Sequence, residues 1–196
     1  VKLSGVCKRA FRRFQHAVFS SAAAAKSVIG TRLMREKFPQ LVGLLCDIRS
    51  AYNEVSRLAC IKALIRVRGL EQLVKAAWAV LSFPTELLMR TLSGFTVIEN
   101  GAGVRQGDPI STAVFCAGLQ QMLEFADHWL RTNGPDGPPE SPDQSWAELG
   151  RLVSAFADDM QVWAGEQAIQ ALLATSTWVR DFKAILNLTL HGVKTT

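Results

Sequence analysis

The chain has 196 residues, 48% of them hydrophobic, and a formal net charge of +5 at neutral pH. That length suits one domain, or one domain with part of another, and the apolar content supports a real core, which excludes a wholly disordered chain. The net charge and a pI near 9.3 favour a polyanionic partner.

Four cysteines lie far apart and form no C-x-x-C pair, so they predict neither a zinc site nor a disulfide framework. Cys46 and Cys116 have apolar neighbours and are expected to be packed core thiols in a reducing compartment. No window has the roughly 18 uninterrupted apolar residues of a membrane span, and the N-terminus lacks the apolar centre of a signal peptide. The chain starts at Val1 and stops at Thr196 without a terminating element, so we expect a fragment.

The first part of the chain predicts a helix and a buried strand behind a basic opening. Five basic residues crowd this opening: Lys2, Lys8, Arg9, Arg12 and Arg13. They predict either a solvated face or a phosphate-contacting patch. Residues 22–38 combine strong helix formers with spaced apolar positions and end before Pro39, so they predict a helix. Residues 40–48, a short apolar run that carries Asp47, predict a buried strand.

Two more helices and a pair of strands are expected next. Asn53 is expected to cap a helix that ends at Gly69, and another helix covers residues 70–82. Residues 85–100 predict two short strands around Gly94.

The longest helical pattern covers residues 108–132, with an acid at the cap and proline at the first helical position. Residues 134–144 hold four of the seven prolines and predict a surface loop. Residues 151–164 predict an apolar hairpin. A helix with an apolar stripe over residues 166–185 and a weak strand over residues 187–192 complete the pattern. This order indicates an α+β fold with a mostly antiparallel sheet and helices on one face.

Two adjacent acids, Asp158 and Asp159, stand between apolar runs in the sequence SAFADDMQVWA. Taken alone, the pair fits an exposed turn, because Asp is a common turn residue. Two like charges among apolar neighbours are costly unless cations compensate them. If the strand of Asp47 is the neighbour of this hairpin, three carboxylates converge and offer the oxygen ligands that Mg²⁺ prefers. Such a cluster predicts a two-metal centre for in-line displacement.

These acids belong to a series of four motifs that follow one another along the chain. They read DIRSAYN from Asp47, GVRQGDPIS from Gly103, FADD ending at Asp159, and LTLHGVKT near the C-terminus. In this order and spacing they resemble motifs A, B, C and D of the reverse transcriptase palm. The stretch LLCDIRSAYNEVSR further resembles the motif LxLDxxxAFNxxxR of non-LTR retrotransposons, including Asn53 and Arg57. The alanine-rich segment upstream is similar to that of the site-specific branch.

The resemblance covers residues 8–196. It implies a partial fingers region over residues 1–39 and a reverse transcriptase palm over residues 40–196, a palm sheet backed by helices. It includes no thumb, no endonuclease and only part of the fingers. The sequence departs from the family pattern in two places: Phe156 stands where Tyr is usual, and Thr112 where Pro is usual.

The resemblance implies a catalytic and metal-binding set. Asp47, Asp158 and Asp159 match the family's metal ligands, with the Ile48 carbonyl as a backbone ligand. Asp158 is expected to matter more than Asp159, because adjacent residues near a strand end diverge. Lys194 matches the motif D lysine proposed to protonate the pyrophosphate leaving group. Without the resemblance, a lysine so close to the chain end predicts only a solvated side chain.

A nucleotide-binding set is implied as well. Tyr52 falls on the aromatic position whose ring lies beneath the sugar and excludes a 2′-hydroxyl, although alone it predicts a core aromatic. Gln106 matches the glutamine that touches the incoming nucleotide and the template, and Gly107 permits close backbone approach. Arg105 either supports a phosphate or forms a surface salt bridge. Asp108 is expected to be a helix cap rather than a catalytic acid.

The function that the resemblance implies is RNA-directed DNA polymerisation in retrotransposition, with two Mg²⁺ ions or Mn²⁺ in their place. The partners would be an RNA template, a DNA or RNA primer and a deoxynucleoside triphosphate. The protein would act inside the cell, in the nucleus at the integration site, and would not bind a membrane. Two alternatives stay open. One is a catalytically inactive remnant that only binds nucleic acid or a partner, and the other is the palm of an intron-encoded or telomerase-like enzyme.

Overall fold

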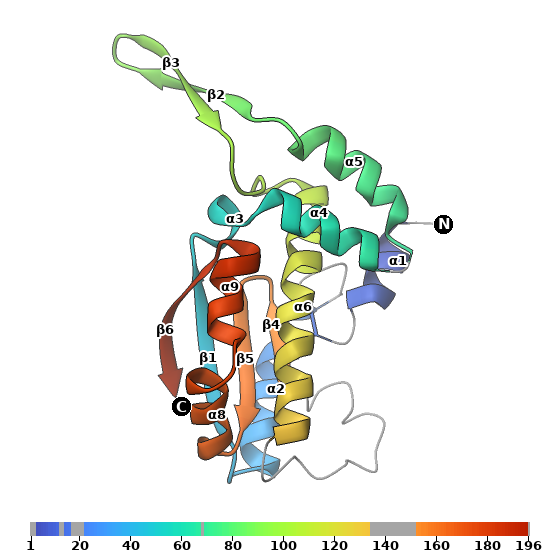
Figure 1. The fold of residues 1–196 in the computed structure, drawn as a ribbon, viewed down its shortest axis with the longest axis vertical. Coiled ribbons are helices and arrows are strands. Elements are labelled where there is room, and N and C mark those ends of the chain that lie inside the picture. The colour runs from blue at the N-terminus through green and yellow to red at the C-terminus, as the bar shows by residue number, and fades with distance from the viewer. Residues whose placement is uncertain (1–2, 12–13, 17–21, 68, 134–151, 196) are drawn as a thin grey trace.

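Four strands form the central sheet in the order β4–β5–β1–β6, and each neighbouring pair is antiparallel (Figure 1). The structure is a computed structural model that describes residues 3–11, 14–16, 22–67, 69–133 and 152–195. Its elements in chain order are α1 (Leu3–Phe11), α2 (Ala23–Lys37), β1 (Val42–Arg49), α3 (Ala51–Glu54), α4 (Arg57–Arg66), α5 (Glu71–Leu81), β2 (Thr85–Thr91), β3 (Gly94–Asn100), α6 (Pro109–Asn133), β4 (Val153–Phe156), β5 (Asp159–Ala164), α8 (Glu166–Ala174), α9 (Trp178–Leu186) and β6 (Thr189–Thr195). The predicted α+β class with an antiparallel sheet is confirmed.

Helices cover both faces of this sheet, not one face as predicted. Successive strand residues point to opposite faces. In β5, Val162 belongs to the main core beneath α6, α8 and α9, whereas Trp163 packs with Met34 of α2 in a second, smaller cluster. The Thr31 hydroxyl of α2 also donates to Gln161 Oε1 at 2.8 Å. The apolar side chain of Trp163 therefore requires cover on the second face, and α2 provides it.

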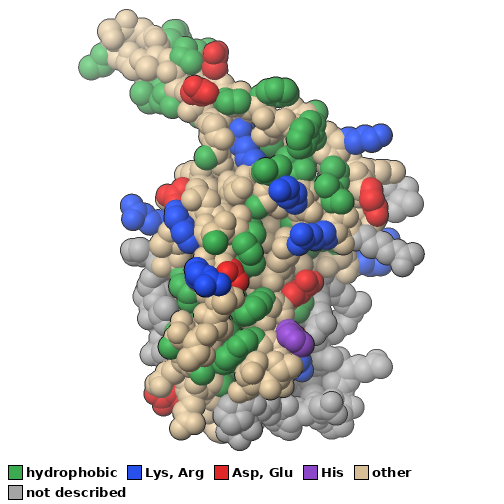
Figure 2. Space-filling view, viewed as in Figure 1, with side chains coloured by type: hydrophobic (Ala, Val, Ile, Leu, Met, Phe, Trp, Pro, Cys, Tyr) green, Lys and Arg blue, Asp and Glu red, His purple; other side chains and the backbone are tan. Residues whose placement is uncertain are grey.

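Among the described residues, the strands β2 and β3 pair only with each other, and they form a hairpin that projects from the rest of the molecule (Figure 1). Leu87 and Leu88 are neighbours in β2, so they point to opposite faces, and they are 44% and 71% exposed. Figure 2 shows hydrophobic side chains along much of this hairpin. A lone two-stranded hairpin is only marginally stable in water, so its attachment to the body matters.

Two predicted helix limits are wrong, and hydroxyl side chains explain both. The helix expected over residues 166–185 is divided into α8 and α9, because the Thr175 and Ser176 hydroxyls donate to carbonyls of α8 and Ser176 Oγ accepts from the Trp178 amide. Such side chains compete with the backbone for helical hydrogen bonds. The predicted cap at Asn53 is also wrong, since Ser56 caps α4 by accepting from the Ala59 amide.

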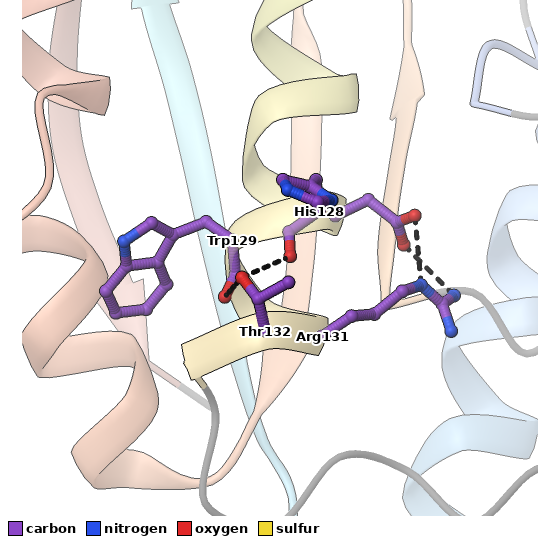
Figure 3. Close-up of polar contacts among 5 residues, drawn as sticks. His128, Trp129, Arg131 and Thr132 are labelled. Carbon is purple, nitrogen blue, oxygen red and sulfur yellow. Dashed lines mark hydrogen bonds and ion pairs between the residues drawn. The ribbon is translucent and has the colours of Figure 1, made fainter.

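The long helix α6 ends in a local network of side-chain bonds (Figure 3). Arg131 donates through Nε and Nη2 to the two carboxylate oxygens of Asp127, each at 3.1 Å. Thr132 donates its hydroxyl to the carbonyls of His128 and Trp129. A cation in the last turn also favours the negative end of the helix dipole.

Three further predictions concern a surface loop, a domain boundary and membrane-spanning helices. The surface loop over residues 134–144 lies outside the described residues. The division into fingers and palm at residues 39 and 40 stays a prediction. Within the described part of the chain, no helix combines the length and apolar character needed to cross a bilayer.

Candidate active site

The three acids of the predicted metal set lie at one end of two neighbouring strands. β1 and β5 pair with Cys46 opposite Met160, and continuing this register by one residue places Asp47 opposite Asp159. Asp158 occupies the turn between β4 and β5, directly after Ala157, which has φ 56°. The predicted adjacency of the Asp47 strand and the acidic hairpin is therefore confirmed.

The charges of these acids act on one another. Partial burial of its carboxyl group raises the pKa of Asp159, although the residue as a whole is exposed, and the negative charges of Asp158 and Asp47 raise it further. Carboxylates that repel each other in this way favour a compensating cation.

A cleft of about 400 Å³ opens beside the acids. Its lining combines the end of β1, the start of α3 and two side chains from distant loops: Asp47, Ile48, Arg49, Ser50, Ala51, Tyr52, Asn53, Gln106 and Asp158. Ile48 is one of these lining residues although it is buried. Five predicted site residues thus meet at one cavity.

The other predicted site residues lie apart from this lining or beyond description. Asp159 is exposed and does not line the cleft, nor do Arg105 and Gly107. The backbone of Lys194 pairs with Leu45 at the opposite side of β1 from β5, but its side chain is outside what the structure describes. The role of each residue stays a prediction.

Tyr52 belongs to the core and to the cleft at once. Its ring stacks on Phe115, with centroids 4.6 Å apart and planes inclined by 20°, and the residue also lines the cavity. Burial raises the pKa of the Tyr52 phenol, and Cys116 and Asp158 add to this, whereas a hydrogen bond with the Thr112 side chain lowers it. The core interpretation and the functional one are therefore compatible.

The segment that carries Gln106 crosses very close to the Tyr52 backbone. Gly103 donates its amide to Val55 O at 3.1 Å, and Val104 donates to Tyr52 O at 2.6 Å. A Cβ at Gly103 would overlap the carbonyl oxygens of Asn53 and Tyr52, and the φ of Gly103 is 69°. Only glycine permits this crossing.

The turn after Gln106 depends on the backbone conformation of Gly107 and on the side chain of Asp108. An added Cβ at Gly107 would meet no protein atom within 4 Å, but its φ of 85° favours glycine. Asp108 accepts from the Ile110 amide at 2.9 Å and from the Ser111 hydroxyl at 3.3 Å. The prediction that Asp108 caps a helix is confirmed.

Two residues with no role predicted from the sequence belong to this region. Arg49 lines the cleft, and its position two residues after Asp47 on the same strand is a signal that could have found it. Arg57 is buried and donates to Gly103 O at 2.6 Å. Its match to the arginine of the motif around Asp47 is the only hint of that contact in the sequence.

The oxygen donors of the cleft suit a Mg²⁺ ion that a substrate would bind as well. Among the described residues, no three histidine, cysteine, aspartate or glutamate side chains form a complete metal-binding group. Mg²⁺ ordinarily takes only one or two carboxylates from a protein and completes its shell with water and substrate phosphates. Asp47 and Asp158, facing one open cavity, match that donor set.

The fold of this chain is similar to that of two telomerase structures. The telomerase from Candida albicans, solved with a TWJ fragment of telomeric RNA, has a TM-score of 0.57 and 12% identity over 96% of this chain and 31% of that chain. An apo telomerase from Candida tropicalis, truncated from its C-terminal domain, has a TM-score of 0.59 and 13% identity over 100% of this chain and 40% of that chain. This chain thus spans well under half of those proteins. No protein-family model matches it, and no curated protein sequence matches it significantly.

Proposed function

We propose that the chain is the palm, with part of the fingers, of an RNA-directed DNA polymerase. The observation that carries the proposal is the meeting of Asp47 and Asp158 with Tyr52 and Gln106 at one cleft. These residues come from three separate motifs, and each has the chemistry that its motif requires. The similarity of the fold to two telomerase structures supports the same assignment.

The residues of the cleft divide the work of nucleotidyl transfer. Asp47 and Asp158, with the Ile48 carbonyl and the nearby Asp159, would hold the Mg²⁺ ions, for which Mn²⁺ can substitute. When bound, these ions activate a primer 3′-hydroxyl and neutralise charge on the triphosphate. Tyr52 would lie beneath the sugar and exclude a 2′-hydroxyl by steric contact.

The phosphate and base contacts would come from the other motifs. Gln106 would touch the incoming nucleotide and the template, beside Arg105 and Gly107. Lys194 would donate a proton to the leaving pyrophosphate. The substrates are an RNA template, a primer and a deoxynucleoside triphosphate, which fit a chain with a net charge of +5.

Two biological settings fit this proposal. The motif resemblance favours a non-LTR retroelement, acting in the nucleus at its integration site. The structural neighbours favour a telomerase-type polymerase as the second candidate. Both settings use the same cleft and the same reaction class.

Primer extension on an RNA template tests the proposal. With Mg²⁺ and deoxynucleotides, the wild-type chain should extend the primer, and Asp158→Asn should reduce the rate by more than about a hundredfold, since several kcal/mol of charge stabilisation are lost. Glu36→Gln, an exposed carboxylate on α2, is the matched control and should keep the wild-type rate. Equal rates for Asp158→Asn and the wild type would reject the assignment.

Metal binding provides a second readout in the same experiment. Mn²⁺ should raise the unfolding temperature of the wild type and of Glu36→Gln, because a ligand that binds only the folded state stabilises it. Asp158→Asn should show little of this shift. A chain that only binds nucleic acid or a partner should show no metal-dependent shift in any variant.

A further inference from the structure

Arg57, the first residue of α4, is a buried cation whose partners are backbone carbonyls. It is 8% exposed. Its Nε donates to Gly103 O at 2.6 Å and Nη1 donates to Phe83 O at 3.0 Å. Its Nη2 donates to Asn100 O at 2.9 Å and to Ala102 O at 3.2 Å. Among the described residues, no carboxylate forms an ion pair with this guanidinium.

Such an arrangement requires a guanidinium. Removing a cation from water is costly unless several good acceptors compensate it, and here four carbonyl dipoles do so. The planar fork of arginine offers donors in several fixed directions, whereas the donors of lysine all radiate from one nitrogen. Lysine at position 57 therefore keeps the charge but cannot reach all four carbonyls.

The four acceptors belong to segments whose positions matter to the cleft. Phe83 precedes β2, and Asn100 ends β3, so Arg57 holds both roots of the projecting hairpin. Ala102 and Gly103 begin the segment that leads to Gln106. Arg57 thus joins the hairpin, the Gln106 segment and the body of the molecule through one side chain.

The same segment is held from its other side by backbone bonds. The Gly103 amide donates to Val55 O and the Val104 amide to Tyr52 O. The chain between Asn100 and Val104 is therefore fixed between the Arg57 guanidinium and the backbone carbonyls of Tyr52 and Val55. Gln106 follows two residues later and faces the cleft that Asp47 lines.

We propose that Arg57 is a positioning residue that holds Gln106 at the cleft lined by Asp47, by fixing the Asn100–Val104 segment and the hairpin roots. Because Arg57 is buried and four of its five N–H groups donate to backbone carbonyls, it acts through Gln106 and not on a substrate. The kinetic consequence rests on the polymerase function proposed above. The structural consequence does not, because it concerns the order of the segment itself.

Two variants on one helix test this inference in the full chain. Arg57→Lys removes the fork and retains the charge. Arg66→Lys is the matched control, because Arg66 is a residue of α4 whose guanidinium donates to the Gln121 side chain at the surface and lies away from the hairpin roots. In primer extension, Arg57→Lys should raise KM for the deoxynucleotide by roughly tenfold to a hundredfold, with a much smaller change in kcat. Arg66→Lys should leave both constants unchanged.

Amide hydrogen exchange supplies the readout that does not depend on activity. In Arg57→Lys, the amides of Gly103 and Val104 should exchange at least about tenfold faster, while amides of β1 and α6 keep their wild-type rates. Unchanged exchange at Gly103 and Val104 would overturn the inference, and so would equal acceleration throughout the chain, which indicates a general loss of stability. If the wild type extends no primer, the polymerase proposal fails and exchange alone decides the role of Arg57.

Discussion

Gly103 marks the point where the Gln106 segment crosses the α3 backbone. Gly103→Ala should lower the free energy of unfolding by about 3 kcal/mol or more, because it combines a positive φ with a Cβ that overlaps two carbonyl oxygens. Gly101→Ala is the control, since a Cβ there meets nothing within 4 Å, and it should change stability by less than about 0.5 kcal/mol. Urea unfolding measures both. Similar midpoints for the two variants would mean that the crossing is looser than described.

Buried thiols make stability depend on alkaline pH. Burial raises the pKa of Cys46 and of Cys60 to about 12, from the ordinary 9.0. Between these values the unfolded chain loses thiol protons that the folded chain keeps, so stability falls as pH rises from about 9 to about 12. Cys46→Ala should flatten this slope by up to about 1.4 kcal/mol per pH unit, which is one proton. Urea unfolding at several alkaline pH values measures it, and parallel slopes for the variant and the wild type would contradict it.

At the scale of elements, the side chains of the β2–β3 hairpin are expected to contribute little to the free energy of unfolding. Leu88 is 71% exposed, whereas Leu123 of α6 is fully buried in the main core. Leu88→Ala should therefore change the free energy of unfolding by less than about 0.5 kcal/mol, and Leu123→Ala should lower it by about 2–5 kcal/mol. Chemical denaturation of the two variants checks this. A large loss from Leu88→Ala would show that the hairpin packs against the body.

The sequence predicts an element correctly where one local signal decides the outcome. Asp108 and Pro109 mark the start of α6, and the apolar runs around Asp158 mark a hairpin. Prediction fails where two local signals compete. The apolar stripe through residues 166–185 predicts one helix, but the hydroxyl groups of Thr175 and Ser176 bond to α8 and divide it. The opening helix α1 is not predicted either, because its dense basic residues obscure the apolar positions that the fold buries.

At the scale of the whole molecule, the sequence predicts the candidate site only to the extent that it predicts which strands are neighbours in the sheet. The motifs predict that Asp47, Tyr52, Gln106 and Asp158 lie together, because their order and spacing match those of a known palm. The contacts of Arg57 are not predictable, because they join carbonyls from segments that approach one another only after folding. Cover of the second sheet face by α2 has the same origin, since α2 docks on β4 and on Trp163 of β5, which lie far from it in the sequence.

The pairing of β1 with β5 has a consequence for how this molecule can change over generations. Asp47 is exposed, whereas Cys46 and Ile48 on either side of it are buried. Because side chains alternate, inserting or deleting one residue within β1 would turn Asp47 toward the core and expose its apolar neighbours. Length variation should therefore be tolerated at the tip of the β2–β3 hairpin, around Leu92 and Ser93, and eliminated within β1. The meeting of the acids therefore depends on the alternation of side chains along β1, which an insertion or deletion of one residue would reverse.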